Sequence, residues 1–285
     1  MKEKGHERIK VRDIMVKDVA YVTVPGTREE LMEMYKKRCI SGVPVVKEGK
    51  LVGIVTRQDL LRNPDENQIA LLMSRDPIKI GPEAKIAEAA KLLISHTIRR
   101  LPVVEGEKLV GLVTVADFLK EIAKWENKEP IGKYLRAKIL ALWEEMPLSV
   151  AARIMELAKV KAVPILNAEL DLTGLITEQD LINAAVIEEG MGHSDLSLGS
   201  DEDEWTWDGM RNTITIYYSV SKIRLPDKLV KDVMVRELVT ATRNSGVSEC
   251  ARKMSAGRFD QLPVISARGK LTGMLIDRDL LRVLS

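Results

Sequence analysis

A threonine and an aspartate, separated by two residues, recur three times in this sequence of 285 residues. The pairs are Thr56/Asp59, Thr114/Asp117 and Thr177/Asp180. A carboxylate has two acceptor oxygens and can take hydrogen bonds from the two cis hydroxyls of a ribose. A threonine hydroxyl at the start of a helix can donate to a phosphate oxygen, and the N–H groups of the first turn also favour an anion. Each pair is therefore a candidate site for a nucleotide-like ligand.

The same spacing also has a local explanation. Thr-x-x-Asp is a capping box, in which both side chains serve their own helix. One side chain can do both, so capping does not exclude ligand binding. A fourth copy keeps Asp279 but has Ile276 in place of the threonine. Two interpretations are open there: Asp279 has a role besides the box, or Asp277 supplies the cap.

The pairs belong to a larger repeat with three anchors. A proline flanked by apolar residues is followed after nine or ten positions by a glycine, and after six more by the aspartate. The proline opens a short strand, whose first residue need not donate a hydrogen bond. A charged turn and a second strand follow, then a helix that begins just before the aspartate. The anchors are Pro44, Gly53 and Asp59; Pro102, Gly111 and Asp117; Pro164, Gly174 and Asp180; and Pro263, Gly273 and Asp279.

An amphipathic helix precedes each proline. In the second copy Ile86, Ala89, Ala90 and Leu93 have the spacing of one helix face, and in the fourth copy residues 247, 250, 251 and 254 repeat it. A further short strand is expected before this helix, as at 20–24. The fold class is thus α/β (α+β), built from four β-α-β-β-α units.

A unit of roughly sixty residues has a poor core on its own. We therefore expect the units to pair, first with second and third with fourth. The predicted organisation is a charged tail at 1–10, repeats at 11–66, 67–126, 127–186 and 229–285, and an insert at 187–228.

The motif Gly-φ-φ-Thr-x-x-Asp, together with the apolar-Pro-apolar strand, resembles the cystathionine β-synthase (CBS) domain family. The motif reads GIVTRQD at 53–59, GLVTVAD at 111–117 and GLITEQD at 174–180, whereas GMLIDRD at 273–279 departs from it. The resemblance implies two tandem pairs, each with a pseudo-twofold axis and ligand clefts between its members. It also implies that the protein binds adenosine-containing ligands and regulates other proteins.

The resemblance also assigns roles to residues. The expected ribose ligands are Asp59, Asp117, Asp180 and Asp279, and the expected phosphate-side hydroxyls are those of Thr56, Thr114 and Thr177. Gly42 and Val43, just before the first proline, are expected to offer backbone groups and an apolar wall to a base. Arg100 and Leu101, before Pro102, and Ala162, before Pro164, are further candidate site residues. Gly53 would let the backbone approach the ligand closely.

The four sites differ in the charged residues near them, and this predicts which sites bind a phosphate best. Arg57 follows Thr56, and Arg99 and Arg100 precede Leu101. Arginine pairs with phosphate in fork geometry, although each of these could instead be a solvated surface charge. Glu178, directly after Thr177, would repel a phosphate. The first two sites are thus expected to bind best. The fourth is expected to bind phosphate poorly, which gives fewer than four nucleotides per chain.

Composition narrows the class of protein. Hydrophobic residues make up 45% and charged residues 30%, which excludes wholesale disorder. The net charge of +2 gives no general attraction to nucleic acid or membrane, and no apolar run approaches a membrane span. The start of the chain is too charged for a secretory signal. We expect a cytoplasmic protein, and the many Lys, Glu and Arg residues lean towards a thermophile.

Catalytic motifs are missing from the sequence. The three histidines and two cysteines lie far apart, so no metal is predicted. There is no phosphate-binding glycine loop of the nucleotide-hydrolysing or dinucleotide type, and no nucleophile beside a recognisable base. Because the four repeats take up nearly the whole chain, we expect a protein that is not an enzyme.

The insert has an unusual charge pattern. Between Glu188 and Asp208 there are eight acidic residues and no Lys or Arg. Residues 213–220 predict a strand, and 208–212 could be the turn of a hairpin between it and the segment with Trp205 and Trp207. The insert is either a solvated acidic loop with a small hairpin or a docking surface for a basic partner.

The favoured hypothesis is a non-catalytic energy or metabolite sensor. It would bind AMP, ADP, ATP or S-adenosylmethionine as a regulatory ligand and signal to a protein partner. The alternative is a ligand-controlled regulator that binds DNA or RNA, for which the sequence offers neither a helix-turn-helix pattern nor a basic stripe. One chain could close a four-repeat disk alone, or two chains could share one as a homodimer.

Overall fold

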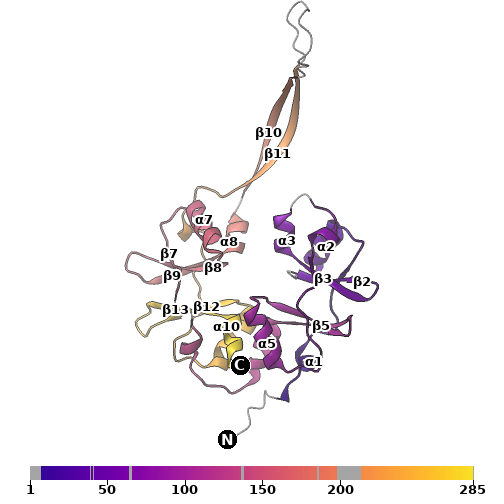
Figure 1. Cartoon of the computed structure of the whole chain (residues 1–285). Helices are drawn as coiled ribbons and strands as arrows, with labels where there is room; N and C mark the ends of the chain where they lie inside the picture. Colours follow the sequence, from indigo (N-terminus) through magenta and orange to yellow (C-terminus); the bar gives the residue numbers. More distant parts are fainter. Residues whose placement is uncertain are drawn as a thin grey trace, which may run out of the picture. The chain divides into compact units, whose positions relative to one another are not determined.

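An α-β-β-α order recurs four times in the computed structural model of the chain, and a short strand or a single β-bridge precedes its first helix (Figure 1). The structure describes residues 8–284, except 39, 41, 64–65, 136–137, 185 and 198–212. It divides into two compact units. The larger one consists of Met1–Ile139, Val239–Arg268 and Thr272–Ser285, and the smaller one of Leu140–Leu238 and Gly269–Leu271.

The first two repeats lie in the larger unit. Repeat one contains α1 (Val11–Ile14), β1 (Val22–Thr23), α2 (Arg28–Arg38), β2 (Gly42–Lys47), β3 (Lys50–Thr56) and α3 (Arg57–Arg62). Repeat two contains α4 (Ile69–Leu72), β4 (Ser74–Arg75), α5 (Ile86–Ser95), β5 (Arg100–Glu105), β6 (Lys108–Thr114) and α6 (Val115–Lys124). Their hairpins β2–β3 and β5–β6 join through β3 and β6 into one sheet.

The other repeats follow the same order. Repeat three contains η2 (Ile131–Tyr134), β7 (Leu142–Trp143), α7 (Leu148–Ala158), β8 (Ala162–Leu166), β9 (Leu172–Thr177) and α8 (Glu178–Ala184). Repeat four contains η3 (Val230–Asp232), α9 (Val247–Gly257), β12 (Gln261–Ile265), β13 (Leu271–Ile276), α10 (Asp277–Leu280) and η4 (Leu281–Leu284). The mixed α+β class and the four repeats are confirmed.

The predicted strand before each main helix is short. It is β1, parallel to β2, in repeat one and β7, parallel to β8, in repeat three. In repeats two and four it shrinks to single parallel bridges, Ile80 with Val103 and Ala241 with Val264.

The helix faces predicted from apolar spacing are buried. Ile86, Ala89, Ala90 and Leu93 of α5 and Val247, Cys250, Ala251 and Met254 of α9 are all at most 1% exposed. Burial also raises the pKa of the Cys250 thiol to about 11, as expected for a structural cysteine. In the larger unit α6 packs against α9, and the Ser248 hydroxyl donates a 2.8 Å hydrogen bond to the Ile122 carbonyl. Repeats two and four therefore share one core.

The leading segment of each repeat, which precedes its main helix, forms hydrogen bonds with the other repeat of its pair. The Val11 N–H, in repeat one, donates to the Ala84 carbonyl of repeat two, and the Ile69 N–H of repeat two donates to Gly26 of repeat one. In the larger unit the Ile131 N–H, from repeat three, donates to Ser245 of repeat four. In the smaller unit the Val230 N–H, from repeat four, donates to Met146 of repeat three. This reciprocal exchange of leading segments follows the expected pairs, first with second and third with fourth.

The motif glycine is the place where the exchanged segment packs. A Cβ added at Gly53, Gly111 or Gly174 would lie within 2.6 Å of the sulfur of Met73, Met15 or Met234, respectively. Each of these methionines comes from the leading segment of the partner repeat. At Gly273 the neighbour is Leu135, whose Cδ1 would be 3.1 Å away. Gly53 was expected to admit a ligand, but the room beside it holds the Met73 side chain.

The insert is a two-stranded antiparallel ribbon, β10 (Val186–Ser197) with β11 (Thr213–Arg224). The strand predicted at 213–220 is confirmed. The hairpin partner of β11 is residues 186–197, which were not predicted to form a strand. The acidic residues Glu188, Glu189 and Asp195 are thus part of a strand, in which a long antiparallel ladder satisfies the backbone N–H and C=O groups. Trp205, Trp207 and the turn predicted at 208–212 lie outside the described residues.

Within the described part of the chain, none of the helices has the length and apolar character needed to cross a membrane.

The packing at the motif glycines predicts the effect of adding a methyl group. Gly111→Ala would place its Cβ 2.4 Å from Met15 Sδ and 3.0 Å from Met15 Cγ, so the exchanged segment must shift. We expect a loss of about 1–3 kcal/mol in the free energy of unfolding, measured by urea denaturation. Gly81→Ala is the matched control, because a Cβ there meets no atom within 4 Å. Equal stability of the two variants would contradict this role of Gly111.

Candidate nucleotide site

The three threonine–aspartate pairs lie where the second strand of each hairpin meets the following helix. In each pair one carboxylate oxygen, Oδ2, accepts both the backbone N–H and the hydroxyl of the threonine. The N–H and hydroxyl distances are 2.8 and 2.6 Å for Thr56/Asp59, 3.0 and 2.7 Å for Thr114/Asp117, and 2.8 and 2.6 Å for Thr177/Asp180. The capping interaction that the spacing predicts is therefore formed in all three.

The second carboxylate oxygen distinguishes the pairs. Asp117 is only 7% exposed, and its Oδ1 accepts a 3.2 Å hydrogen bond from Lys120. Asp59 and Asp180 are half-buried, and within the described part of the chain their Oδ1 atoms accept no hydrogen bond. These two carboxylates can thus serve the helix with one oxygen and a ligand hydroxyl with the other.

Arg100 of repeat two reaches into the first pair's surroundings. A Cβ added at Gly42 would lie 1.6 Å from Arg100 Nη1 and 3.0 Å from the Thr56 methyl group. Gly42 is opposite Thr56 in the β2–β3 ladder, so the guanidinium lies directly beside the Thr56/Asp59 box. Only a residue without a side chain leaves room for it at position 42.

The electrostatics of this cluster agree with its geometry. Burial lowers the pKa of Arg100, while Tyr35 and Asp59 act in the opposite direction. Burial also raises the pKa of the Tyr35 phenol, whose hydroxyl donates a 2.9 Å hydrogen bond to the Val55 carbonyl. Arg57 lies over the Tyr35 ring, 5.7 Å from its centre. Two arginines from two repeats, together with Asp59, therefore lie around the Tyr35 phenol.

Two of the predicted contacts with a base are limited by burial. Val43 and Leu101 are 0% exposed and belong to the cores of repeats one and two. Their side chains pack inside, so only their backbone groups could face a ligand. Ala162 is half-buried and lies opposite Thr177 in the β8–β9 ladder. Glu178, expected to repel phosphate there, is the exposed first residue of α8.

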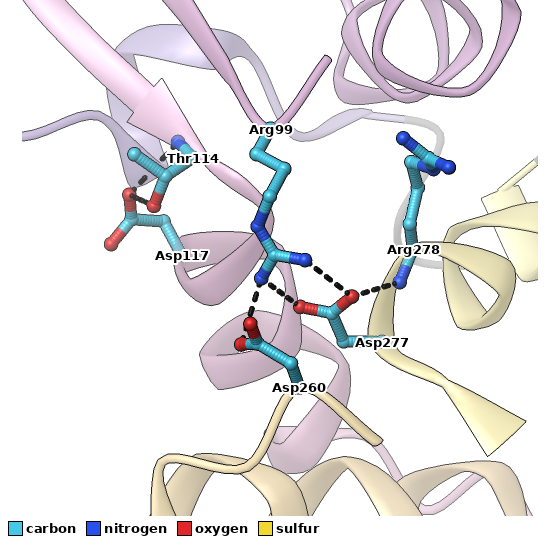
Figure 2. A network of polar contacts seen from close by, with 6 residues as sticks. All are labelled: Arg99, Thr114, Asp117, Asp260, Asp277 and Arg278. Carbon is cyan, nitrogen blue, oxygen red and sulfur yellow. Dashed lines mark hydrogen bonds and ion pairs between the residues drawn. The ribbon is translucent and has the colours of Figure 1, made fainter. Parts of the chain in front are cut away.

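Arg99 faces repeat four rather than a ligand site (Figure 2). Its Nη1 and Nη2 donate to the two oxygens of Asp277 at 3.2 and 2.5 Å, and Nη2 also donates to Asp260 Oδ1 at 2.8 Å. The Arg278 N–H donates to Asp277 Oδ1 at 2.6 Å. Asp277 thus accepts a bidentate guanidinium from another repeat, in addition to a local backbone bond.

The fourth aspartate is engaged with its own helical turn. Asp279 is 3% exposed and forms a 3.3 Å ion pair with Arg282. Ile276 precedes the first residue of α10, where it contributes no hydroxyl. The surroundings of Asp279 therefore differ from those of the three complete pairs.

Sequence reasoning missed two of these residues. Tyr35 lies on the apolar face of α2 and reads as an ordinary core residue. Asp260 occupies the position three residues before Pro263, which is the position of Arg99 before Pro102. Opposite charges at equivalent positions of two repeats were a signal that the two could pair.

Comparison with known proteins agrees with this geometry. Residues 11–66, 68–124, 131–187 and 230–285 each match the CBS domain model. The chain therefore belongs to the CBS domain family.

Relatives share the four-repeat fold. The uncharacterized protein MJ1225 of Methanocaldococcus jannaschii is 27% identical over 191 residues, which is 60% of this chain and 68% of that protein. Its crystal structure, described as a putative archaeal homolog of g-AMPK, covers 97% of this chain and all of that one, with a TM-score of 0.69 and 19% identity. An uncharacterized conserved protein from Pyrococcus horikoshii has a TM-score of 0.71, with 28% identity, over 97% of this chain and all of its own.

One enzyme is similar to this chain over only a part of its own length. The inosine-5'-monophosphate dehydrogenase of Korarchaeum cryptofilum is 35% identical over 127 residues, 44% of this chain but 27% of the enzyme. The similarity thus leaves most of that enzyme unmatched.

The buried carboxylate of Asp277 predicts a pH effect on stability. Burial outweighs the attraction of Arg99 and raises the pKa of Asp277 to about 6. The folded state then holds more protons than the unfolded state between pH 4 and 6, so this group's contribution to stability falls as the pH rises through that window. The contribution is about 2–3 kcal/mol in the free energy of unfolding.

Urea denaturation at pH 4.5 and pH 7 tests this in Asp277→Asn. The stability difference between the two pH values should shift by that amount relative to the native chain. Asp18→Asn is the control, because its carboxylate is 91% exposed and lies outside the Arg99 cluster. An unchanged difference in Asp277→Asn would show that the buried carboxylate does not titrate in this window.

Proposed function

We propose that this protein is a non-catalytic regulatory protein that binds an adenosine-containing ligand at the first site and signals to a protein partner. The observation that carries the proposal is that Arg57, Arg100 and Asp59 all lie around Tyr35, and that Arg100 lies beside Gly42 and the Thr56/Asp59 box. Membership of the CBS domain family supports it, because the motif resemblance implies ligands of this class. AMP, ADP, ATP and S-adenosylmethionine are the candidates.

Each group of the ligand has a matching partner at this site. Asp59 Oδ1 would accept the ribose hydroxyls while Oδ2 stays in the capping box. The Arg100 guanidinium, half-buried beside Gly42, would pair with a phosphate in the fork geometry that arginine favours. Arg57 is exposed over Tyr35 and can turn towards a longer phosphate chain. The Thr56 hydroxyl would have to leave Asp59 in order to donate to a phosphate oxygen.

The second and third sites are weaker candidates. Lys120 already uses the remaining oxygen of Asp117, and Arg99 is held by repeat four. The Oδ1 atom of Asp180 could accept a ligand hydroxyl, but Glu178 places a negative charge beside Thr177. The first site thus combines an available carboxylate oxygen with positive charge.

Calorimetry on protein shown to be ligand-free tests the proposal. We expect binding of at least one of AMP, ADP, ATP and S-adenosylmethionine in the micromolar range, about −8 kcal/mol, without hydrolysis. The reason is that the site offers partners for ribose and phosphate. The proposal fails if none of the four ligands gives a binding signal.

Asp59→Ala separates ligand binding from helix capping. If Asp59 accepts the ribose hydroxyls, the variant should lose about 2–4 kcal/mol of binding free energy. A residue that only caps α3 should cost roughly 1 kcal/mol of unfolding free energy and leave affinity unchanged. Asp180→Ala is the matched control, because its box has the same 2.6 Å hydroxyl bond but lies beside Glu178. Equal affinity losses in the two variants would argue against the first site.

A further inference from the structure

Arg99 and Arg100 are adjacent but have different surroundings. Arg100 lies beside Gly42 and the Thr56/Asp59 box, whereas Arg99 is bound by two carboxylates of repeat four. Both residues are half-buried. The two neighbouring arginines thus face different parts of the larger unit: Arg100 faces the first site, and Arg99 faces the carboxylates of repeat four.

The contacts of Arg99 are those that arginine makes with a phosphate. A guanidinium binds carboxylates and phosphates alike through two parallel N–H donors. Asp277 occupies both donors of the fork, and Asp260 adds a third bond on Nη2. With both aspartates ionised, the cluster of one cation and two anions carries a net charge of −1, which repels a further anion.

The exposed fraction of the Arg99 side chain shows that a ligand could contact it if the two aspartates did not. Its side chain is 35% exposed and that of Asp260 is 57% exposed, whereas Asp277 is 2% exposed. The cluster is thus open to solvent on the side of Asp260 and closed on the side of Asp277.

We propose that Asp277 and Asp260 act as an internal substitute for a ligand phosphate, so that repeat four occupies Arg99 and excludes phosphate-bearing ligands from it. Removing the two charges should then expose a latent anion site. The proposal rests on the proposed function in one respect: it assumes that Arg100, next in the chain, serves the first site.

The test is Asp260→Asn combined with Asp277→Asn, which keeps the shape of both side chains and removes their charges. Native mass spectrometry should count one more bound AMP per chain than in the native protein. Calorimetry should show this additional site, or, if the native chain binds there weakly, an affinity at least tenfold higher. Adding Arg99→Ala to the double variant should abolish the gain.

A matched control removes two acidic charges elsewhere. Asp13→Asn with Asp171→Asn gives the same net charge but leaves Arg99 and its partners in place, and should bind as many AMP molecules as the native chain. If the Asp260/Asp277 double variant shows no cooperative thermal unfolding, it is not folded, and Asp260→Asn alone then serves as the test. It should then raise AMP affinity at least threefold in an Arg99-dependent manner.

The outcomes separate this inference from the proposed function. A folded double variant that binds no more AMP than the native chain overturns the inference. If the native chain itself binds AMP, the proposal for the first site still stands. A double variant that binds one AMP supports the latent site even if the native chain binds none of AMP, ADP, ATP and S-adenosylmethionine, a result that would contradict the first site. A gain that persists after Arg99→Ala also overturns the inference.

Discussion

The exchange of leading segments is the constraint on which the rest of the structure depends. A repeat of this size cannot cover its own sheet. Each repeat therefore receives a short segment from its partner, and a methionine or leucine of that segment packs against the motif glycine. The glycine leads directly into the threonine–aspartate pair, three and six residues later. The same strand thus connects the contact that joins two repeats to the residues that could hold a ligand.

The threonine–aspartate pair shows how one motif can meet two requirements. Its Oδ2 closes the capping box in the same way in repeats one, two and three. What differs is the surroundings of Oδ1, which a lysine occupies in repeat two and which is left to other donors in repeats one and three. A helix cap keeps the carboxylate in place, and fixed acceptors bind a ligand at a lower entropic cost. Capping and ligand binding therefore support each other at Asp59.

The repeat, its elements and its pairing could be predicted because each depends on local spacing. Proline, glycine and aspartate recur at fixed intervals, and the faces of α5 and α9 follow from apolar periodicity. The partners of Arg99 could not be found in this way, since Asp260 and Asp277 lie 161 and 178 residues further along the chain. The room at Gly42 also depends on tertiary packing, because a residue of another repeat fills it. Only one strand of the β10–β11 ribbon was predicted. The sequence of β11 is strand-forming, whereas the glycines and acidic residues of β10 have little strand propensity of their own.

The adjacency of Arg99 and Arg100 links the stability of repeat four to the first site. The backbone of Arg99 accepts a 3.1 Å hydrogen bond from Val115, the first residue of α6, and Arg100 pairs with Thr114 in the β5–β6 ladder. The bidentate bond to Asp277 fixes the side chain of Arg99 and so limits the movement of the peptide that leads into Arg100. Arg100 then extends from a fixed backbone position, so less conformational freedom is lost when its guanidinium meets a phosphate. Repeat four would then contribute to ligand binding at the first site without contacting the ligand, by anchoring the strand from which Arg100 extends.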